Sequence, residues 1–202
     1  MKLRQITKVK RSVTFGRFNI GHSGHVELIQ KMLDHSEVAD VFVSSGSSNN
    51  SWDLRVLLLR SLLRREGAPL ERVNFLRANS PYRAIRQSLS QAGSPFDLTL
   101  FLGDDQKEMG FSLSRTFDIF LSFNRRTNSS TNVRFLLDRN PDSDLLEKVY
   151  KGHQYPIRLA HLLRAEEKSH EKLLKPSRKV SESRKKRTKA EAPFATVESP
   201  AV

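Results

Sequence analysis

The chain turns from strand to helix in the stretch Gly16-Arg17-Phe18-Asn19-Ile20-Gly21-His22-Ser23-Gly24-His25, and this turn sets the pattern for the rest of the domain. Before it, residues 12–15 form a short β-type run that ends at the first glycine. After it, apolar side chains recur at helical spacing, at Val26, Ile29, Met32 and Leu33. A strand that runs through a glycine into a helix is typical of the first unit of an α/β domain.

Strand-like and helix-like segments continue to alternate along most of the chain. Runs rich in β-branched and aromatic residues predict strands over 12–15, 38–43, 72–76, 96–102 and 117–123. Amphipathic spacing predicts helices over 24–35, 52–65 and 81–91, the last capped by Ser80, and two or three further helices to about Leu174. This alternation predicts a parallel five-stranded sheet with helices on both faces, a three-layer α/β/α arrangement.

Four polar loops each follow a predicted strand, at residues 16–25, 44–50, 103–106 and 124–131. Because the carboxyl ends of parallel strands meet at one edge of a sheet, we expect all four loops to open on that edge. Ligands of such sheets bind beyond this edge, where the strand order reverses. The loops therefore predict a single site.

The chain has 202 residues and a net charge of +13, and much of that charge lies near its end. Between Lys175 and Lys189 there are eight Lys or Arg and one acid, Glu182, which together carry +7. This stretch has no apolar face, so burial cannot offset the entropy cost of ordering it. The rest of the chain carries the remaining +6, so we expect a moderately basic domain over residues 1–174 and a disordered basic tail over 175–202.

Composition excludes several classes of protein. There is no cysteine, so the chain can form neither a disulfide framework nor a thiolate metal site. The N-terminus lacks the apolar stretch of a signal peptide, and no segment approaches the ~18 apolar residues of a membrane span. We therefore expect a cytoplasmic protein that makes no membrane contact.

The turn at residues 16–25 has the features of a phosphate site. Gly16 lets backbone amides approach an anion closely, and the helix start near Gly24 presents N–H groups with a partial positive charge. His22 and His25 are three residues apart, which brings both imidazoles to the same side. Such a pair can stabilise the charge that develops when an α-phosphate is attacked. Strand–glycine–helix turns without any catalytic role are also common, so the residues alone leave both interpretations open.

His22-Ser23-Gly24-His25 resembles the HxGH signature of the nucleotidyltransferase superfamily, which includes nicotinamide mononucleotide and pantetheine phosphate adenylyltransferases and cytidylyltransferases. Gly16-Arg17-Phe18 is similar to the GRF that opens the motif in some nicotinamide mononucleotide enzymes and in several phage-encoded relatives. Ile20-Gly21 departs from the pattern, since relatives often carry proline there. The resemblance implies a Rossmann-like nucleotidyltransferase fold and catalytic roles for His22 and His25. It also implies that the nucleotide is bound by Gly16, Arg17, Phe18, Asn19 and Gly24.

A second stretch, Ser129-Ser130-Thr131-Asn132-Val133-Arg134, resembles the superfamily's ISSTxxR motif, which follows strand 5 and opens a helix. Asn128 takes the place of the usual isoleucine. The resemblance implies that Ser129, Ser130 and Thr131 hold the β- and γ-phosphates, and that Arg134 neutralises pyrophosphate as it leaves. A planar guanidinium suits this role because it donates two parallel hydrogen bonds. Simple helix capping would explain the hydroxyls but not the arginine.

Two other loops supply further candidates. Leu102-Gly103-Asp104-Asp105 resembles the GxD that follows strand 4 in many relatives and lines the nucleoside pocket, which makes Gly103 and Asp105 nucleotide-binding candidates. An ordinary Gly-Asp turn is the alternative. Ser44 follows strand 2, where relatives approach the second substrate, and Arg55 on the next helix could reach a substrate phosphate. A solvated helix arginine is the alternative for Arg55.

These features predict a nucleotidyltransferase that moves a nucleotidyl group, AMP from ATP or its equivalent from another nucleoside triphosphate, onto a phosphorylated small molecule and releases pyrophosphate. The GRF opening favours nicotinamide mononucleotide as the acceptor, and hence NAD biosynthesis. The sequence has no cluster of protein metal ligands, so we expect Mg²⁺ to be held mainly by the nucleotide phosphates. Superfamily relatives are often oligomers, which makes a homo-oligomer one expectation here.

The alternative is a non-catalytic protein with this fold, structural or associated with nucleic acid, such as a component of a phage virion. The run Arg184-Lys185-Lys186-Arg187 can bind nucleic acid weakly through phosphates without reading sequence, or can serve as a localisation signal or a solubilising end. The two hypotheses differ in one product, because only the enzyme has to release pyrophosphate.

Overall fold

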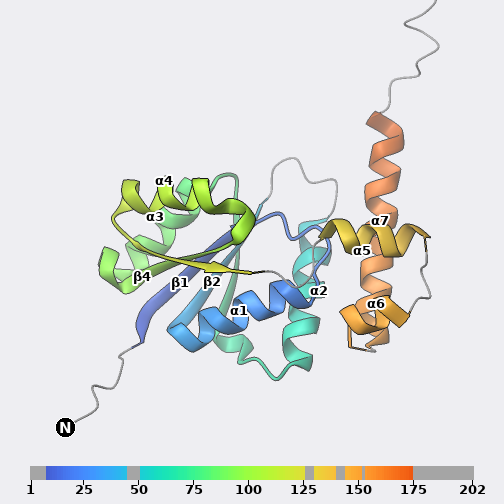
Figure 1. Cartoon of the computed structure of the whole chain (residues 1–202), viewed down its shortest axis with the longest axis horizontal. Coiled ribbons are helices and arrows are strands. Elements are labelled where there is room, and N and C mark those ends of the chain that lie inside the picture. The colour runs from blue at the N-terminus through green and yellow to red at the C-terminus, as the bar shows by residue number, and fades with distance from the viewer. Residues whose placement is uncertain (1–7, 45–50, 126–129, 140–143, 152, 175–202) are drawn as a thin grey trace, which may run out of the picture. The chain divides into compact units, whose positions relative to one another are not determined.

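The computed structural model describes residues 8–44, 51–125, 130–139, 144–151 and 153–174 (Figure 1). The chain divides into two units, Met1–Glu167 and Lys168–Val202, and the second is described only as far as Leu174. The expected tail over 175–202 lies outside the described residues, so its boundary and its disorder stay predictions. In the part of the chain that is described, no helix combines the length and apolarity needed to cross a membrane.

Helices and strands alternate as the sequence predicts. In chain order they are β1 (Val9–Gly16), α1 (Ser23–His35), β2 (Ser36–Ser44), α2 (Trp52–Arg65), β3 (Val73–Ala78), α3 (Pro81–Ala92), β4 (Leu98–Gly103), α4 (Lys107–Phe117), β5 (Phe120–Asn124), α5 (Ser130–Arg139), α6 (Asp144–Val149) and α7 (Gln154–Leu174). Single 3₁₀ turns precede β3 and β4 and follow β4. The predicted cap of α3 is present, since the Ser80 hydroxyl accepts from the backbone N–H of Arg83 at 3.3 Å and Pro81 is the first helical residue.

The five strands form one sheet in the order β3-β2-β1-β4-β5, and every neighbouring pair is parallel. This confirms the predicted sheet. The chain builds outward from β1 to β3 on one side and then returns to place β4 on the other side of β1. The strand order therefore reverses between β1 and β4, and the carboxyl ends of these two strands are where ligands of such sheets bind.

The two faces of the sheet carry different helices, as alternate side chains of β2 illustrate. Val41 and Val43 belong to a core shared with α1 and α2, whereas Phe42 belongs to a core shared with α3 and α4. All three side chains are fully buried, as expected for a parallel strand covered on both faces. Figure 1 shows α3 and α4 on one side of the sheet and α1 on the other, which completes the three layers.

The C-terminal helices extend the core that α1 and α2 share. Val133 and Leu137 of α5, Leu146 of α6, and Ile157 and Leu163 of α7 are all buried in it. This packing places α5 and the first part of α7 next to the turn that follows β1, and so supplies the far side of the site described below.

Two predicted strands begin earlier in sequence than the structure allows. Phe117 ends α4 rather than starting β5, because Asp118 adopts a left-handed conformation (φ 53°) and its N–H bonds to the Ser114 carbonyl as a helix cap. Phe96 lies in a 3₁₀ turn rather than in β4, and its backbone N–H bonds to the Ser94 hydroxyl at 3.2 Å. In both places an apolar residue just before the strand belongs to the element that precedes it, a helix for Phe117 and a 3₁₀ turn for Phe96.

Candidate functional site

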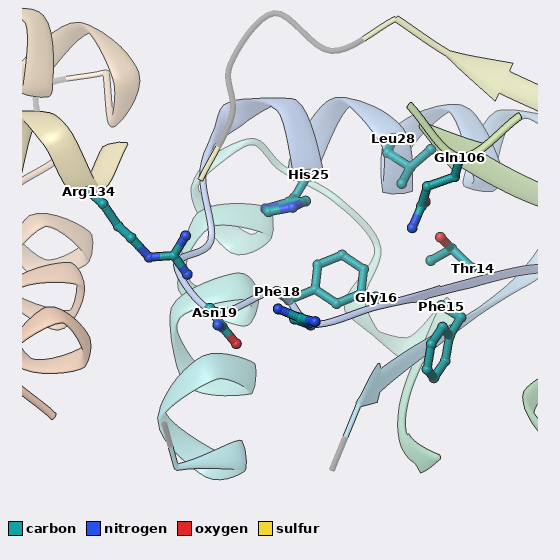
Figure 2. Close-up of a pocket in the computed structure, with 10 residues that line it drawn as sticks. Thr14, Phe15, Gly16, Phe18, Asn19, His25, Leu28, Gln106 and Arg134 are labelled. Carbon is teal, nitrogen blue, oxygen red and sulfur yellow. The ribbon is translucent and has the colours of Figure 1, made fainter. Parts of the chain in front are cut away.

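A pocket of about 360 Å³ lies at the carboxyl end of β1, beside the point where the strand order reverses. The described residues that line it come from the end of β1, the following turn, α1, the turn after β4, and α5. They are Thr14, Phe15, Gly16, Arg17, Phe18, Asn19, His25, Leu28, Gln106 and Arg134. Figure 2 shows His25 in the middle of this group, with the Arg134 side chain on one side and Gln106 on the other.

The turn after β1 is shaped by Phe18 rather than by a flexible glycine. Phe18 has a positive φ of 48°, is 5% exposed, and packs its ring against His25 with 4.9 Å between centroids. A Cβ on Gly16 would lie 3.1 Å from the Phe18 ring, so the missing side chain makes room for it. Glycine is therefore needed at this position for close packing, and that packing turns the backbone of residues 16–19 along one side of the pocket.

The two histidines of the HxGH stretch lie one behind the other. His22 is the residue just before α1, and its carbonyl accepts from the backbone N–H of His25 at 2.9 Å. The imidazoles stack with 3.9 Å between centroids and 27° between planes. His25 lines the pocket, whereas His22 is fully buried beneath it. The first turn of α1 contains no acidic residue, so nothing there opposes the partial positive charge of the helix start.

Arg55 holds the turn in place from α2. Its guanidinium donates to the carbonyl of Arg17, to that of Ser44 at 2.9 Å and, more weakly, to that of Ser51 at 3.4 Å. The side chain is 1% exposed. Burial lowers the pKa of Arg55, the nearby Arg77 lowers it further, and the Glu166 carboxylate acts in the opposite direction. Arg55 and Ser44, predicted to bind substrate, thus come together in a buried brace between the turn after β1 and the end of β2.

Tyr150 is a second brace on the same turn. Its hydroxyl donates to the Gly21 carbonyl at 2.9 Å, and the side chain is 1% exposed. Burial raises the pKa of the Tyr150 hydroxyl, which keeps it a neutral donor at physiological pH. Since Tyr150 follows α6, this bond ties the C-terminal helices to the turn that leads into the histidines.

Arg134 enters the pocket from α5 and is held by charge. It donates two hydrogen bonds to Glu167, at 2.9 and 2.8 Å, and Arg164 donates to Glu167 at 2.9 Å and to Asp138 at 2.9 and 2.7 Å. Burial on its own would raise the pKa of Glu167, but the hydrogen bonds and charges of the two arginines lower it below its ordinary value. The pKa of Arg164 moves in the opposite direction, since hydrogen bonding to Asp138 raises it above its ordinary value. The Arg134 guanidinium is therefore oriented before any ligand binds.

The other predicted site residues that the structure describes are not among those that line the pocket. Gly24 is buried in the first turn of α1, and Gly103 is the buried last residue of β4. Asp105 is exposed in the 3₁₀ turn after β4, and its neighbour Gln106 lines the pocket instead. Thr131 is exposed near the start of α5. Ser130 is the first residue of α5, and Ser129 lies outside the described residues. Their roles stay predictions.

Sequence reasoning missed several residues that shape the site. Gln106 gave no signal beyond its place in a loop, and Thr14 and Leu28 read as ordinary strand and helix positions. The adjacent carboxylates of α7 were also missed, although Glu166 accepts from the Ser51 N–H at 3.0 Å and Glu167 holds Arg134. Only the folded chain brings these two residues of a late helix next to Ser51 and Arg134.

Within the described ranges, no group of three or more His, Cys, Asp or Glu side chains is arranged to hold a metal ion. The pocket itself presents guanidinium and imidazole nitrogens and two side-chain amides, those of Asn19 and Gln106, and these groups suit an anion. This donor set fits a magnesium ion only as a companion of bound phosphates, since Mg²⁺ takes oxygen ligands.

No protein-family model matches the chain, and no curated protein matches its sequence. Its fold resembles that of Plasmodium falciparum nicotinic acid mononucleotide adenylyltransferase complexed with APC, with a TM-score of 0.59 and 12% identity over 78% of this chain and 97% of that one. The same enzyme complexed with NaAD matches with a TM-score of 0.58 and 13% identity over 80% and 98% of the two chains. A bifunctional NMN adenylyltransferase/ADP ribose pyrophosphatase from Francisella tularensis, complexed with AMP and a manganese ion, gives a TM-score of 0.51 and 16% identity over 92% of this chain and 57% of that one. At these identities the likeness establishes the fold, a three-layer Rossmann-like α/β fold like that of these nucleotidyltransferases.

Proposed function

We propose that this chain is an adenylyltransferase that moves AMP from ATP onto a phosphorylated small molecule and releases pyrophosphate. One observation carries the proposal: Arg134, which is far away in sequence, lines a single pocket at the strand-order reversal together with His25 and the backbone turn at residues 16–19. Such a pocket offers backbone amides, a helix start, an imidazole and a guanidinium, a combination suited to a triphosphate.

The reaction needs no nucleophilic side chain. A phosphate oxygen of the acceptor attacks the α-phosphorus of ATP and forms the new P–O bond. The bond from the α-phosphorus to the oxygen that bridges to the β-phosphate breaks, and its electron pair leaves with pyrophosphate. The protein's task is to hold both phosphates in line and to stabilise the extra negative charge on the α-phosphate.

Each part of the pocket has a role in this proposal. His25 and the first amides of α1 stabilise the charge that develops on the α-phosphate. His22, buried beneath His25, positions its ring by stacking. Arg134, already oriented by Glu167, neutralises the departing pyrophosphate, with Ser129, Ser130 and Thr131 holding the β- and γ-phosphates. Mg²⁺, bound mainly by the nucleotide's own phosphate oxygens, supplies further charge neutralisation.

For the acceptor we propose a pyridine mononucleotide, nicotinamide or nicotinic acid mononucleotide. The proposal is supported by the GRF opening at residues 16–18 and by fold neighbours whose names give these two acceptors. The product would then be NAD or its nicotinic acid analogue.

The deciding experiment measures pyrophosphate release and identifies the other product by chromatography. The full chain is incubated with ATP, Mg²⁺ and, separately, nicotinamide mononucleotide, nicotinic acid mononucleotide and phosphopantetheine. We expect pyrophosphate and a dinucleotide in equal amounts with one of the two pyridine mononucleotides. Release with phosphopantetheine alone would keep the reaction and replace the acceptor. A folded protein that releases no pyrophosphate with any acceptor would overturn the enzymatic function and favour the non-catalytic alternative.

A further inference from the structure

A second pocket, of about 390 Å³, lies away from the proposed active site, between α2 and the first part of α7. It is lined by Leu57, Arg60, Ser61, Arg64, Arg65 and Tyr155. No residue is common to this pocket and to the one at the end of β1. We call it the arginine groove.

Most of the residues that line the groove come from one face of α2. Its five α2 residues follow the spacing i, i+3, i+4, i+7 and i+8 from Leu57, which is one face of a helix. The opposite face is the buried one and includes Val56, Leu59 and Leu63. Burial of the opposite face therefore fixes the side of α2 on which the three arginines lie.

The positive charge of the groove is not paired with acids in the part of the chain that the structure describes. Among the described residues, none of the guanidinium groups of Arg60, Arg64 and Arg65 forms an ion pair with an acid. Two of them contact aromatic rings instead: Arg60 lies over the Phe75 ring at 5.5 Å, and Arg65 donates to Nδ1 of His153 at 3.0 Å. Like charges at i and i+4, as at Arg60 and Arg64, destabilise a helix, so the folded chain on its own gains nothing from this arrangement.

The groove also presents apolar and aromatic surface next to the charge. Tyr155 is 47% exposed and Leu57 is 41% exposed, and both line the same pocket. Guanidinium groups suit phosphates because they donate in a planar fork, and an exposed aromatic ring suits the face of a base. Phosphodiester charge beside stackable bases is the chemistry of a single-stranded nucleic acid.

We propose that the arginine groove binds single-stranded nucleic acid, with Arg60, Arg64 and Arg65 on the phosphates and a base on Tyr155. The duplex is the poorer fit, since its bases are stacked on each other and cannot lie on the tyrosine ring. The proposal is independent of the adenylyltransferase site, because the two pockets share no lining residue.

The test uses the full chain and fluorescence anisotropy of a labelled oligothymidylate of about 12 nucleotides, within the usual site size. The variant Arg60→Gln/Arg64→Gln/Arg65→Gln removes the groove's charge and keeps good helix formers. The control Arg83→Gln/Arg86→Gln/Arg115→Gln removes the same charge from exposed positions on α3 and α4. We expect the groove variant to bind at least about tenfold more weakly and its salt slope to fall by about two, with little change in the control. Equal loss in both variants, or in neither, would overturn the proposal, because the basic tail is present in every protein compared.

A second arm tests the base contact. Tyr155→Ala should weaken binding of the oligothymidylate several-fold and leave binding of an abasic strand of the same length unchanged. Equal binding of the two strands by the unaltered chain, or tighter binding of a duplex, would overturn the assignment to single-stranded nucleic acid. Pyrophosphate release by the groove variant, measured alongside, should equal that of the unaltered chain if the chain is an adenylyltransferase. Oligonucleotide binding tests the arginine groove and pyrophosphate release tests the adenylyltransferase, so either proposal can fail without the other.

Discussion

The two sides of the pocket at the end of β1 are built in different ways. The loop side, residues 16–25, is a continuous stretch that packs against the core and is braced by Arg55 and Tyr150 from beneath. The charged side is Arg134 with Glu167, Arg164 and Asp138, brought together from α5 and α7. The loop side is shaped by packing and by buried hydrogen bonds to backbone carbonyls, whereas the charged side is shaped by ion pairs between side chains.

This difference predicts how the two sides of the site respond to pH and salt. Packing and buried hydrogen bonds to backbone carbonyls depend less on pH and salt than ion pairs do, so the loop side should keep its shape over a wide range of conditions. The charged side depends on the ionisation of Glu167 and is partly exposed, since the Arg134 side chain is 28% exposed. Acid or salt should therefore loosen the charged side first.

The largest expected effect comes from the loop side, at His25. His25→Ala should lower kcat for pyrophosphate release by about 10²- to 10³-fold, because it removes a fixed donor from the place where charge develops. Steady-state kinetics, with thermal unfolding as a check on folding, would measure this. His161→Ala, on α7 and outside the pocket lining, is the matched control. A kcat unchanged by His25→Ala would remove this residue from the mechanism.

A smaller effect is expected on the charged side, at Arg134. Arg134→Gln should lower kcat/KM for ATP by about 10- to 100-fold, because a bidentate contact to phosphate is lost. Arg134→Lys should recover only part of this, since an ammonium group cannot donate in a planar fork. Full recovery by lysine would mean that charge alone matters at this position and that the orientation set by Glu167 does not.

Glu167 tests the pH dependence of the charged side. Glu167→Gln should lower the free energy of unfolding at neutral pH by about 2 kcal/mol, because two arginines lose their carboxylate. The pKa of Glu167 lies below its ordinary value in the folded chain. Its stabilising contribution is therefore complete above the unfolded pKa, about 4.3, and is lost as the pH falls through the lower folded value.

Urea unfolding of the two proteins from neutral pH down to about pH 3 would follow this effect. The difference between them should narrow as the pH falls below about 4. Glu147→Gln, at an exposed carboxylate on α6, is the control and should show almost no difference at any pH. A difference for Glu167→Gln that stays constant across the range would show that the carboxylate stabilises by packing and not by charge.

The smallest expected effect is on the brace beneath the loop side. Tyr150→Phe should lower the free energy of unfolding by about 1 kcal/mol, because the Gly21 carbonyl loses its donor while the ring stays packed. The effect should not change between mildly acidic and neutral pH, since the buried hydroxyl stays neutral. Tyr82→Phe, at an exposed tyrosine of α3, is the comparison. A pH-dependent loss in Tyr150→Phe would contradict the distinction between the two sides.

Much of the fold follows from local sequence. The strand and helix around residues 16–25 were predicted from hydrophobic periodicity, and the start of α3 from the Ser80-Pro81 cap, because both signals act over a few neighbouring residues. The start of β5 was predicted wrongly because Phe117 is apolar in either structure, and only the left-handed Asp118 makes it the end of a helix. The GRF, HxGH and ISSTxxR resemblances supplied the lining residues Gly16, His25 and Arg134 respectively, since each motif is a short local stretch.

The sequence by itself determined the alternation of strands and helices, the turn at residues 16–25 and the basic character of the chain, because each depends on residues close together along the backbone. Only the tertiary structure decided that β4 returns to the side of β1, so that the turn after it supplies Gln106 to the pocket. It also decided that Arg55 braces a turn from within the core and that Glu167 orients Arg134. These are contacts between segments far apart in sequence, and they form only when burial of the shared core brings the segments together.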